Sequence, residues 1–299
     1  GDDQTWQELL ASIGEGEYVP PVCQPDDAHC LLYTSGTTGR PKGVVHATGG
    51  YLVGTTYLSR AFYQIQERDI YWSTSDIGWI VGHSFIVYGP LSNGCTQVMY
   101  EGVPNHPGND RFWEIVAKYG VTKFYTAPTA IRTFMKWGAD EPAKHDLSSL
   151  QLLGTVGEPI NPEAWEWYYH TIGEAKCPIV DTWWQTETGW AIVANCRGIE
   201  ELPVKAGSPT KAVPGYNVMV LDDEGKEVGP NTEGNIVVKL PLPPGTLPTL
   251  WKNDKRFVES YMTTFPGYYE TSDGGYIDED GYVYVMGRMD DVINIAGHR

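Results

Sequence analysis

The sequence predicts an α/β protein in which a layered parallel sheet with covering helices is followed by a small β-rich, barrel-like subdomain. Apolar strand-like runs alternate with helix-like stretches from Ala28 to about Ala194, a pattern typical of a parallel sheet. After about Pro203 the pattern changes to short strands joined by acidic turns. The chain has 299 residues, 41% of them hydrophobic and 12% aromatic, which is enough for a large core. The expected divisions are an acidic lead-in at 1–27, an α/β subdomain at 28–205 and a β-rich subdomain at 206–288.

The periodicity of the apolar residues predicts the individual elements. The first is a short amphipathic helix over Asp3–Ile13, with Asp3 as its N-cap. The expected strands of the α/β part are Cys30–Thr34, Val98–Glu101, Lys123–Thr126, Leu152–Val156 and Ile179–Thr182. Its expected helices are Phe112–Tyr119, Thr129–Trp137 and Pro162–Tyr169, the last with proline at a favourable first position. The β-rich part is expected to contain strands Tyr216–Leu221 and Asn235–Leu240, and a hairpin in which Asp278–Gly281 joins Tyr276–Ile277 to Tyr282–Met286.

The composition excludes several classes of function. The formal net charge is −17, whereas nucleic acids and anionic membrane surfaces require clustered cations. No apolar run approaches the ~18 residues of a transmembrane helix. The five cysteines are scattered without a C-x-x-C pair and the histidines lack metal-ligand spacing, so neither a disulfide framework nor a zinc site is expected. We expect a cytoplasmic protein whose partners are small molecules, not nucleic acids or membranes.

The most informative segment runs from Tyr33 to Gly43 and reads YTSGTTGRPKG. Its glycines permit close backbone approach to a ligand, its N–H groups can bind anions, and Lys42 adds a charge suited to phosphate. Pro41 before the lysine and glycine after it exclude the helix that a Walker A loop requires. Apolar runs on both sides predict strands. We interpret the segment as a phosphate-binding loop between two strands; the alternative is an ordinary surface loop.

Polar segments also follow two expected strands of the sheet. Gly157-Glu158-Pro159 follows one strand, and Asp181–Gly189, with its adjacent tryptophans, follows the start of another. Ligands of α/β sheets bind at the carboxyl ends of the strands. Thr186 and Glu187 offer oxygen atoms that suit Mg²⁺ bound to phosphates. The alternatives are a plain turn, core packing of the tryptophans and a solvated surface glutamate.

Together these segments resemble the adenylate-forming enzymes, and in detail the AMP-forming acetyl-CoA synthetases and their short-chain relatives. The resemblance runs from about Asp26 to Arg299 and includes Tyr125–Arg132 and Glu158–Trp167. It implies the fold of the large N-terminal domain of that superfamily. It also implies a reaction in which a carboxylate attacks the α-phosphate of Mg·ATP, giving acyl-AMP and pyrophosphate. The CoA thiol then attacks the acyl carbon, giving acyl-CoA and AMP, so ATP and CoA would be substrates and Mg²⁺ the cofactor.

The resemblance assigns roles residue by residue. The catalytic residues would be Thr34, Lys42 and Glu187, with Glu187 as the metal ligand. Contacts to ATP or AMP would come from Thr34, Ser35, Gly36, Thr37, Thr38, Gly39, Lys42, Gly157, Glu158, Pro159, Asp181, Thr182, Trp183, Trp184, Gln185, Thr186, Asp273, Arg288 and Arg299. Within that set Asp273 would bind the ribose, Arg288 ribose or phosphate, and Arg299 the α-phosphate. Taken alone, Asp273 would be a turn residue and Arg288 a surface arginine.

The same resemblance assigns the acyl and CoA sites and a hinge. The acyl pocket would consist of Ile80, Val81, Val156 and Trp184, with the indole of Trp184 as a floor that admits only a short chain. CoA would contact Val81, Asn105 and Ala296. Residues 289–299 would be the hinge, at Asp290, and the start of a further domain.

The sequence departs from the family pattern in two ways. The resemblance implies an N-terminal segment and a C-terminal lid domain with the adenylation lysine, neither of which is in this sequence, so we expect residues 1–299 alone to form no appreciable acyl-CoA. Val81 and Ala296 stand where acetyl-CoA synthetases commonly have threonine and serine.

The acyl substrate is expected to be acetate, with propionate as the alternative. Val156 is typical of the acetate-type enzymes, whereas Val81 and Lys239–Gly245 resemble the propionate-type group. One methylene is worth only ~1–3 kcal/mol of discrimination. Two further alternatives are an adenylation domain that loads a carrier protein and a non-catalytic nucleotide-binding module.

Overall fold

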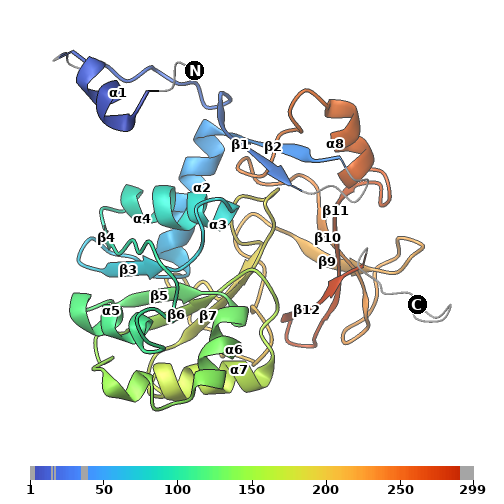
Figure 1. Ribbon diagram of the computed structural model, residues 1–299. Coiled ribbons are helices and arrows are strands. Elements are labelled where there is room, and N and C mark those ends of the chain that lie inside the picture. Colours follow the sequence, from blue (N-terminus) through green and yellow to red (C-terminus); the bar gives the residue numbers. More distant parts are fainter. Residues whose placement is uncertain (1–3, 15, 17, 35–39, 290–299) are drawn as a thin grey trace.

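The computed structural model describes residues 4–14, 16, 18–34 and 40–289, and it confirms the predicted α/β fold class. Figure 1 shows a two-stranded hairpin and two larger sheets, the first of them covered by helices. The N-terminal helix α1 (Trp6–Ser12) lies apart from the rest, and none of its residues is buried. Its N-cap is Thr5, not the predicted Asp3, because Thr5 and Glu8 exchange the reciprocal hydrogen bonds of a capping box.

The larger sheet within the described residues has six strands in the order β4-β3-β5-β6-β7-β8. The first five are parallel, and β8 pairs antiparallel with β7. Both β5 and β6 are buried throughout, as expected of parallel strands covered on two faces. The strands are β3 (Ile70–Ser73), β4 (Thr96–Gln97), β5 (Lys123–Thr126), β6 (Leu152–Thr155), β7 (Ile179–Trp183) and β8 (Val193–Ala194).

Helices cover both faces of this sheet. In Figure 1, α2, α3 and α4 lie on one side of it and α5, α6 and α7 on the other. On the first side are α2 (Thr48–Ala61), α3 (Ile80–Gly82), the π-helical η1 (His83–Tyr88) and α4 (Gly89–Ser92). On the second side are α5 (Arg111–Tyr119), α6 (Pro128–Trp137) and α7 (Pro162–Trp167). The 3₁₀ turn η2 (Pro142–Lys144) follows α6 in the chain, and the π-helical η3 (Tyr168–Ile172) follows α7.

Successive residues of β3, β5, β6 and β7 enter two different hydrophobic clusters. Tyr71 and Leu152 pack with α2, whereas their neighbours Trp72 and Leu153 pack with α5, α6 and α7. This follows from the alternation of side chains along a strand. The result is a three-layer arrangement with a core on each face of the sheet.

The second sheet is antiparallel, in the order β12-β11-β10-β9. The sequence predicted a small β-rich, barrel-like subdomain, and the described strands form an open sheet with β12 and β9 at its edges; pairing shifts within β10–β11 and β11–β12 distort it. Helix α8 (Asp254–Tyr261), absent from the sequence predictions, packs on β11 through the stacked rings of Tyr261 and Tyr269. The strands are β9 (Val218–Leu221), β10 (Gly234–Lys239), β11 (Tyr268–Ile277) and β12 (Val283–Arg288).

The predicted phosphate loop connects two strands, as expected. Strands β1 (Ala28–Thr34) and β2 (Lys42–Ala47) pair antiparallel, with Thr34 opposite Lys42. The segment before α8 is hydrogen-bonded to this hairpin: the backbone N–H of Trp251 donates to the carbonyl of Gly43 over 2.8 Å. The loop residues 35–39 lie outside the described residues.

One expected strand was wrong. The structure places β4 at Thr96–Gln97, and Val98–Glu101 is not a strand. Val98 still donates to the carbonyl of Tyr71, but the ring of Tyr100 then packs on Trp72 and Phe112. The apolar run therefore serves side-chain packing beyond the point where strand pairing ends. The domain boundaries at residues 27, 205 and 288 stay predictions.

Trp190 is held between helix α2 and the segment that follows β10. It is 4% exposed. A Cβ atom built on Gly245 would lie 1.3 Å from its ring, and one built on Gly54 would lie 2.2 Å away. Only glycine lets the two backbones approach the indole so closely.

Gly245→Ala is therefore expected to lower the free energy of unfolding by about 1–3 kcal/mol, the usual cost of overpacking. Gly229→Ala is the matched control, since a Cβ there would meet no atom within 4 Å. Urea unfolding of both variants measures the difference. Equal midpoints for the two variants would contradict the packing argument.

Candidate functional site

A lysine and a glutamate face each other beside the phosphate loop. Lys42, the first residue of β2, places Nζ 3.6 Å from Oε1 of Glu187, which lies in the turn after β7. Both side chains are largely buried, at 14% and 13% exposure. Thr34, opposite Lys42 in the hairpin, buries its hydroxyl without a hydrogen bond to any residue that the structure describes. Three predicted catalytic residues therefore come from one hairpin and the adjoining sheet edge.

Tyr261, which the sequence analysis missed, contacts both members of this pair. Its hydroxyl donates to Glu187 Oε1 over 2.6 Å, and its ring centroid lies 4.6 Å from Lys42 Nζ. Burial raises the pKa of Tyr261, and the nearby Glu187 carboxylate raises it further. The hydroxyl therefore stays a donor at physiological pH.

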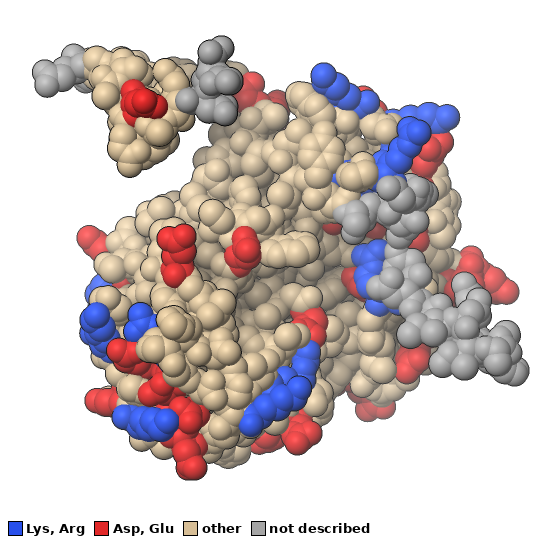
Figure 2. All heavy atoms as spheres, viewed as in Figure 1, with Lys and Arg blue, Asp and Glu red and all other residues tan. Residues whose placement is uncertain are grey.

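The helix that carries Tyr261 also contacts the phosphate loop directly. The Asn253 side chain caps α8 by accepting from the N–H of Arg256. The guanidinium of Arg256 donates to the carbonyls of Arg40 and Pro41, over 2.6 and 3.1 Å. Figure 2 shows Lys and Arg side chains gathered at this corner, which α8 occupies in Figure 1. Arg256 thereby brings a positive charge to the loop, although Asp254 and Glu259 balance Lys255 and Arg256 within the helix itself.

Gln185 links the segment after β7 to the second sheet. Its amide nitrogen donates to the carbonyl of Thr271 over 2.6 Å and to Oδ2 of Asp273 over 2.8 Å. Its amide oxygen accepts from the hydroxyl of Tyr269 over 2.9 Å. The predicted adenine-binding segment and the predicted ribose carboxylate are thus in direct contact.

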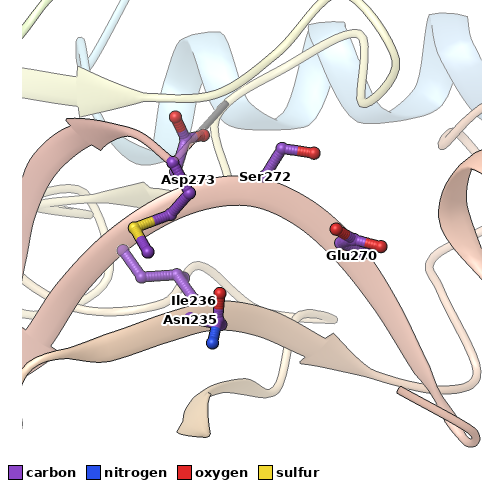
Figure 3. A pocket seen from close by; sticks show the side chains of 6 residues that line it. Asn235, Ile236, Glu270, Ser272 and Asp273 are labelled. Atoms are coloured by element: carbon purple, nitrogen blue, oxygen red, sulfur yellow. The ribbon is translucent and has the colours of Figure 1, made fainter. Parts of the chain in front are cut away.

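Asp273 and Arg288 are neighbours across β11 and β12, where they form a cross-strand pair. Asp273 is 7% exposed. Beside it lies a cavity of about 190 Å³, which Figure 3 shows along the curved β11 strand above β10. The cavity is lined by Asn235, Ile236, Glu270, Ser272, Asp273 and Met289.

Gly157 and Glu158 form the turn at the carboxyl end of β6. Gly157 has a φ of +99°, a conformation that favours glycine. Burial disfavours the charged form of Glu158, but hydrogen bonds from Thr129 and Arg132 outweigh it and lower its pKa. The backbone N–H of Thr129 donates over 2.7 Å and Arg132 over 2.6 Å. Glu158 therefore ties this turn to the start of α6; Pro159 follows it.

The predicted nucleotide residues Asp181 and Thr182 are buried in the sheet. Oδ1 of Asp181 accepts from the hydroxyl of Thr155 over 2.5 Å and from the N–H of Thr182 over 3.0 Å. Burial raises the pKa of Asp181 to about 7. Trp183 ends β7, and the carbonyl of Thr186 accepts from Nε2 of the buried His46 over 2.8 Å. This contact joins the segment to β2.

The four predicted acyl-pocket residues share one hydrophobic cluster, although they come from three separate segments. Ile80 and Val156 are buried, and Val81 and Trp184 are half-buried and pack against them. The indole of Trp184 meets the ring of Phe85 edge-on, with ring centroids 5.3 Å apart. Phe85, which the sequence analysis did not name, is thus a direct neighbour of Trp184.

The predicted CoA and hinge residues are only partly described. Asn105 is exposed in an irregular segment before α5. Ala296, Asp290 and Arg299 lie outside the described residues, as do Ser35, Gly36, Thr37, Thr38 and Gly39.

Across 4–14, 16, 18–34 and 40–289, the chain brings no three His, Cys, Asp or Glu side chains together as a metal site. A single carboxylate still suits Mg²⁺, which proteins bind through one or two carboxylates and the phosphates of a substrate. Glu187 is the carboxylate beside the phosphate loop. In the same part of the chain, no helix combines the length and apolar character needed to cross a membrane.

Comparison with known proteins identifies relatives over the whole chain. The family described as AMP-binding enzyme matches residues 2–245. Acetyl-coenzyme A synthetases of Streptomyces avermitilis and Rubrobacter xylanophilus are 53% and 51% identical over the full chain, which spans 45% and 46% of their lengths. A crystal structure of an acyl-CoA synthetase from Brucella canis superposes with a TM-score of 0.84 at 32% identity, and the chain covers 52% of it. The chain thus spans about half the length of the proteins it matches.

Asp181→Asn is expected to remove a pH-dependent destabilisation. The pKa of Asp181 is about 7 in the folded chain, whereas the ordinary pKa of an aspartate is 3.8. The folded state therefore binds this proton more tightly than the unfolded state does. The carboxyl's contribution to stability is full below about pH 4 and is lost as the pH rises through about 7. The stability of the variant relative to the parent should therefore rise over that range, by about 1.4 kcal/mol per unit of pKa difference.

Urea unfolding at both ends of this pH range measures the effect. Asp146→Asn is the control, because hydrogen bonds from Ser148 lower the pKa of this exposed carboxyl below its ordinary 3.8, so its contribution changes below about pH 4 and should stay nearly constant over this range. A difference between Asp181→Asn and parent that does not change with pH would contradict the assignment.

Proposed function

The chain belongs to the family of AMP-binding enzymes, and on that premise we propose that the protein carrying it activates acetate with ATP and transfers the acyl group to CoA. The products would be acetyl-CoA, AMP and pyrophosphate. Support comes from the two acetyl-coenzyme A synthetases that match the full chain at 53% and 51% identity. Because the chain spans less than half of each, the activity of the whole protein remains our proposal.

The observation that carries this proposal is a chain of contacts that joins the phosphate-loop hairpin, the segment after β7 and the second sheet. Lys42 meets Glu187 beside the phosphate loop, and Gln185, two residues earlier, meets Asp273. Asp273 in turn pairs with Arg288 across the second sheet. The contacts thus bring a cation that suits phosphate and a carboxylate that suits ribose into one connected site, with Gln185 between them.

In the proposed reaction the residues of the chain mainly position and neutralise the phosphates. The ammonium of Lys42 and the N–H groups of residues 35–39 would bind the β- and γ-phosphates, and the Thr34 hydroxyl would donate to them. Charge neutralisation lets the carboxylate of acetate approach the α-phosphate, and most of the rate gain in phosphoryl chemistry comes from such positioning. Glu187 would hold Mg²⁺, which would supply positive charge to neutralise the phosphates.

The remaining nucleotide contacts follow the same proposal. Gly157, with its positive φ and without a side chain, would let the backbone approach the adenine ring, and Glu158 and Pro159 would hold that turn in place. Asp273 would accept from both ribose hydroxyls, and Arg288 would contact ribose or phosphate. Asp181 and Thr182 would support the adenine segment from within the sheet, since their side chains are buried there.

Acetate is the proposed acid because a large indole faces a small apolar cluster. Ile80, Val81 and Val156 would line the acyl pocket and Trp184 would close it. Propionate is the second candidate, favoured by valine at position 81. CoA would enter past Val81 and Asn105, with Mg²⁺, ATP and CoA all required for turnover.

Lys42→Ala and Asp273→Asn are expected to weaken ATP binding about tenfold each, the scale of one hydrogen bond to a charged group. Lys42→Ala should leave adenosine binding unchanged, because adenosine has no phosphate. Asp273→Asn should weaken both ligands, because both contain ribose. Calorimetry on the full-length protein measures this, with the exposed Lys118→Ala as control. Unchanged ATP affinity in both variants would refute the nucleotide site.

Trp184→Gly is expected to shift the preferred acid from acetate to acids of four or more carbons. Removing the floor opens apolar volume, and each buried methylene is worth ~0.8 kcal/mol. Acetate use should fall at least about tenfold, since a small acid would no longer be held. Carboxylate-dependent exchange of pyrophosphate into ATP measures the optimum.

Trp137→Gly provides the control for this experiment, because that indole packs in the hydrophobic cluster on the opposite face of the sheet. It should leave the preferred chain length unchanged. If Trp184→Gly keeps the parent's preference for acetate, Trp184 serves core packing and the pocket assignment fails.

A further inference from the structure

We propose that Tyr261 is a positioning residue that holds the Glu187 carboxylate ready for Mg²⁺ while Lys42 leaves that carboxylate for the phosphates of ATP. This inference rests on the proposed function of the site. It names a residue of helix α8, in the part of the chain where the sequence predicted only strands. Tyr261 would act through Glu187 and would not itself touch the substrate.

The geometry makes Glu187 the shared partner of two different donors. The Tyr261 hydroxyl lies 2.6 Å from Glu187 Oε1, a short charge-assisted hydrogen bond. Lys42 Nζ lies 3.6 Å from the same oxygen, a longer and looser ion pair. Because both contacts use Oε1, the carboxylate can offer Oε2 to an ion without releasing Tyr261.

Binding of Mg²⁺ to Glu187 would weaken the ion pair between Glu187 and Lys42. An ammonium and a divalent cation on one carboxylate repel each other strongly in a site that is mostly shielded from water. Both side chains are at most 14% exposed, so solvent screens this repulsion poorly. Binding of Mg·ATP would therefore favour an exchange in which Lys42 turns to the phosphates while Oε2 of Glu187 receives the metal. Tyr261 is the partner that Glu187 keeps through the exchange.

Tyr261 is itself held rigidly. Its ring stacks on that of Tyr269 at 5.4 Å with an interplanar angle of 16°. Tyr269 in turn donates to Gln185, two residues before Glu187. Arg256, five residues before Tyr261 on the same helix, is bonded to the backbone of Arg40 and Pro41. Helix α8 therefore keeps a constant relation to both the phosphate loop and the segment that carries Glu187.

The decisive variant is Tyr261→Phe, which removes the hydroxyl and keeps the ring that stacks on Tyr269. We expect the dissociation constant of Mg·ATP to rise about tenfold in the full-length protein. ATP binding in the presence of EDTA should change by less than about twofold, because without the metal Glu187 has no ligand to hold. Calorimetry under the two conditions measures this split, which is the difference between the effect on Mg·ATP binding and the effect on metal-free ATP binding. A purely structural role would weaken both kinds of binding equally, and that result would overturn the proposal, as would no change in either.

Two further variants complete the test. Tyr276→Phe is the matched control: it removes a hydroxyl from another stacked pair on β11, with Tyr284 at 4.7 Å, and should leave both affinities unchanged. Glu187→Gln should by itself remove most of the gain in affinity that Mg²⁺ brings to ATP. Adding Tyr261→Phe to it should then cost nothing more, because coupled residues are not additive. Full additivity would refute action through Glu187.

The outcome for this inference can be separated from the outcome for the proposed function. If the parent binds Mg·ATP but shows no acetate-dependent pyrophosphate exchange, the activity is wrong and the binding split still decides the role of Tyr261. If the parent shows exchange and Tyr261→Phe shows no split, the inference fails alone. Should Tyr261→Phe not fold, Glu187→Gln still decides, because a retained preference for Mg·ATP in that variant would overturn the proposal.

Discussion

The contacts of Glu187 hold together three parts of the chain that are far apart in sequence. Its carboxylate meets Lys42 from the hairpin and Tyr261 from helix α8, and its carbonyl accepts from the N–H of Leu247 over 2.9 Å. A buried carboxylate is costly unless it is paired and hydrogen-bonded. The carboxylate therefore depends on Lys42 and Tyr261, and the backbone bond from Leu247 joins the same turn to the segment after β10.

The apolar core sets the same arrangement on a larger scale. One hydrophobic cluster contains Tyr51 of α2 and Tyr125 of the parallel sheet together with Val220 and Ile236 of the second sheet. Burial of this shared surface fixes the second sheet against the edge where β6 and β7 end. The candidate nucleotide residues then face one another because their strands end at a common edge, as ligand sites in α/β sheets do. The polar contacts of Gln185 complete an arrangement that packing has already imposed.

Local pattern predicted a large share of this structure. Strand β5 occurs at the predicted residues, α5 and α6 each begin one residue earlier than predicted, and the hairpin around the phosphate loop is present. These succeed because apolar periodicity, a proline at the first helical position and glycine-rich turns act within a few residues. The errors are also local in origin. Val98–Glu101 has the composition of a strand, but pairing beyond Gln97 depends on a neighbour that the local sequence does not specify.

The sequence by itself determined the fold class, the phosphate loop with Lys42, and the segments that carry Glu187, Gln185 and Asp273. Only the tertiary structure decided which of these side chains meet and which face inward. It brought Tyr261 to Lys42 and Arg256 to Arg40, each from more than two hundred residues away. It also buried Asp181 within the sheet, which raises its pKa to about 7. The physical reason is that hydrogen bonds, ion pairs and desolvation act over a few ångströms in space, and only the packing of both sheets into one core brings distant residues within that range.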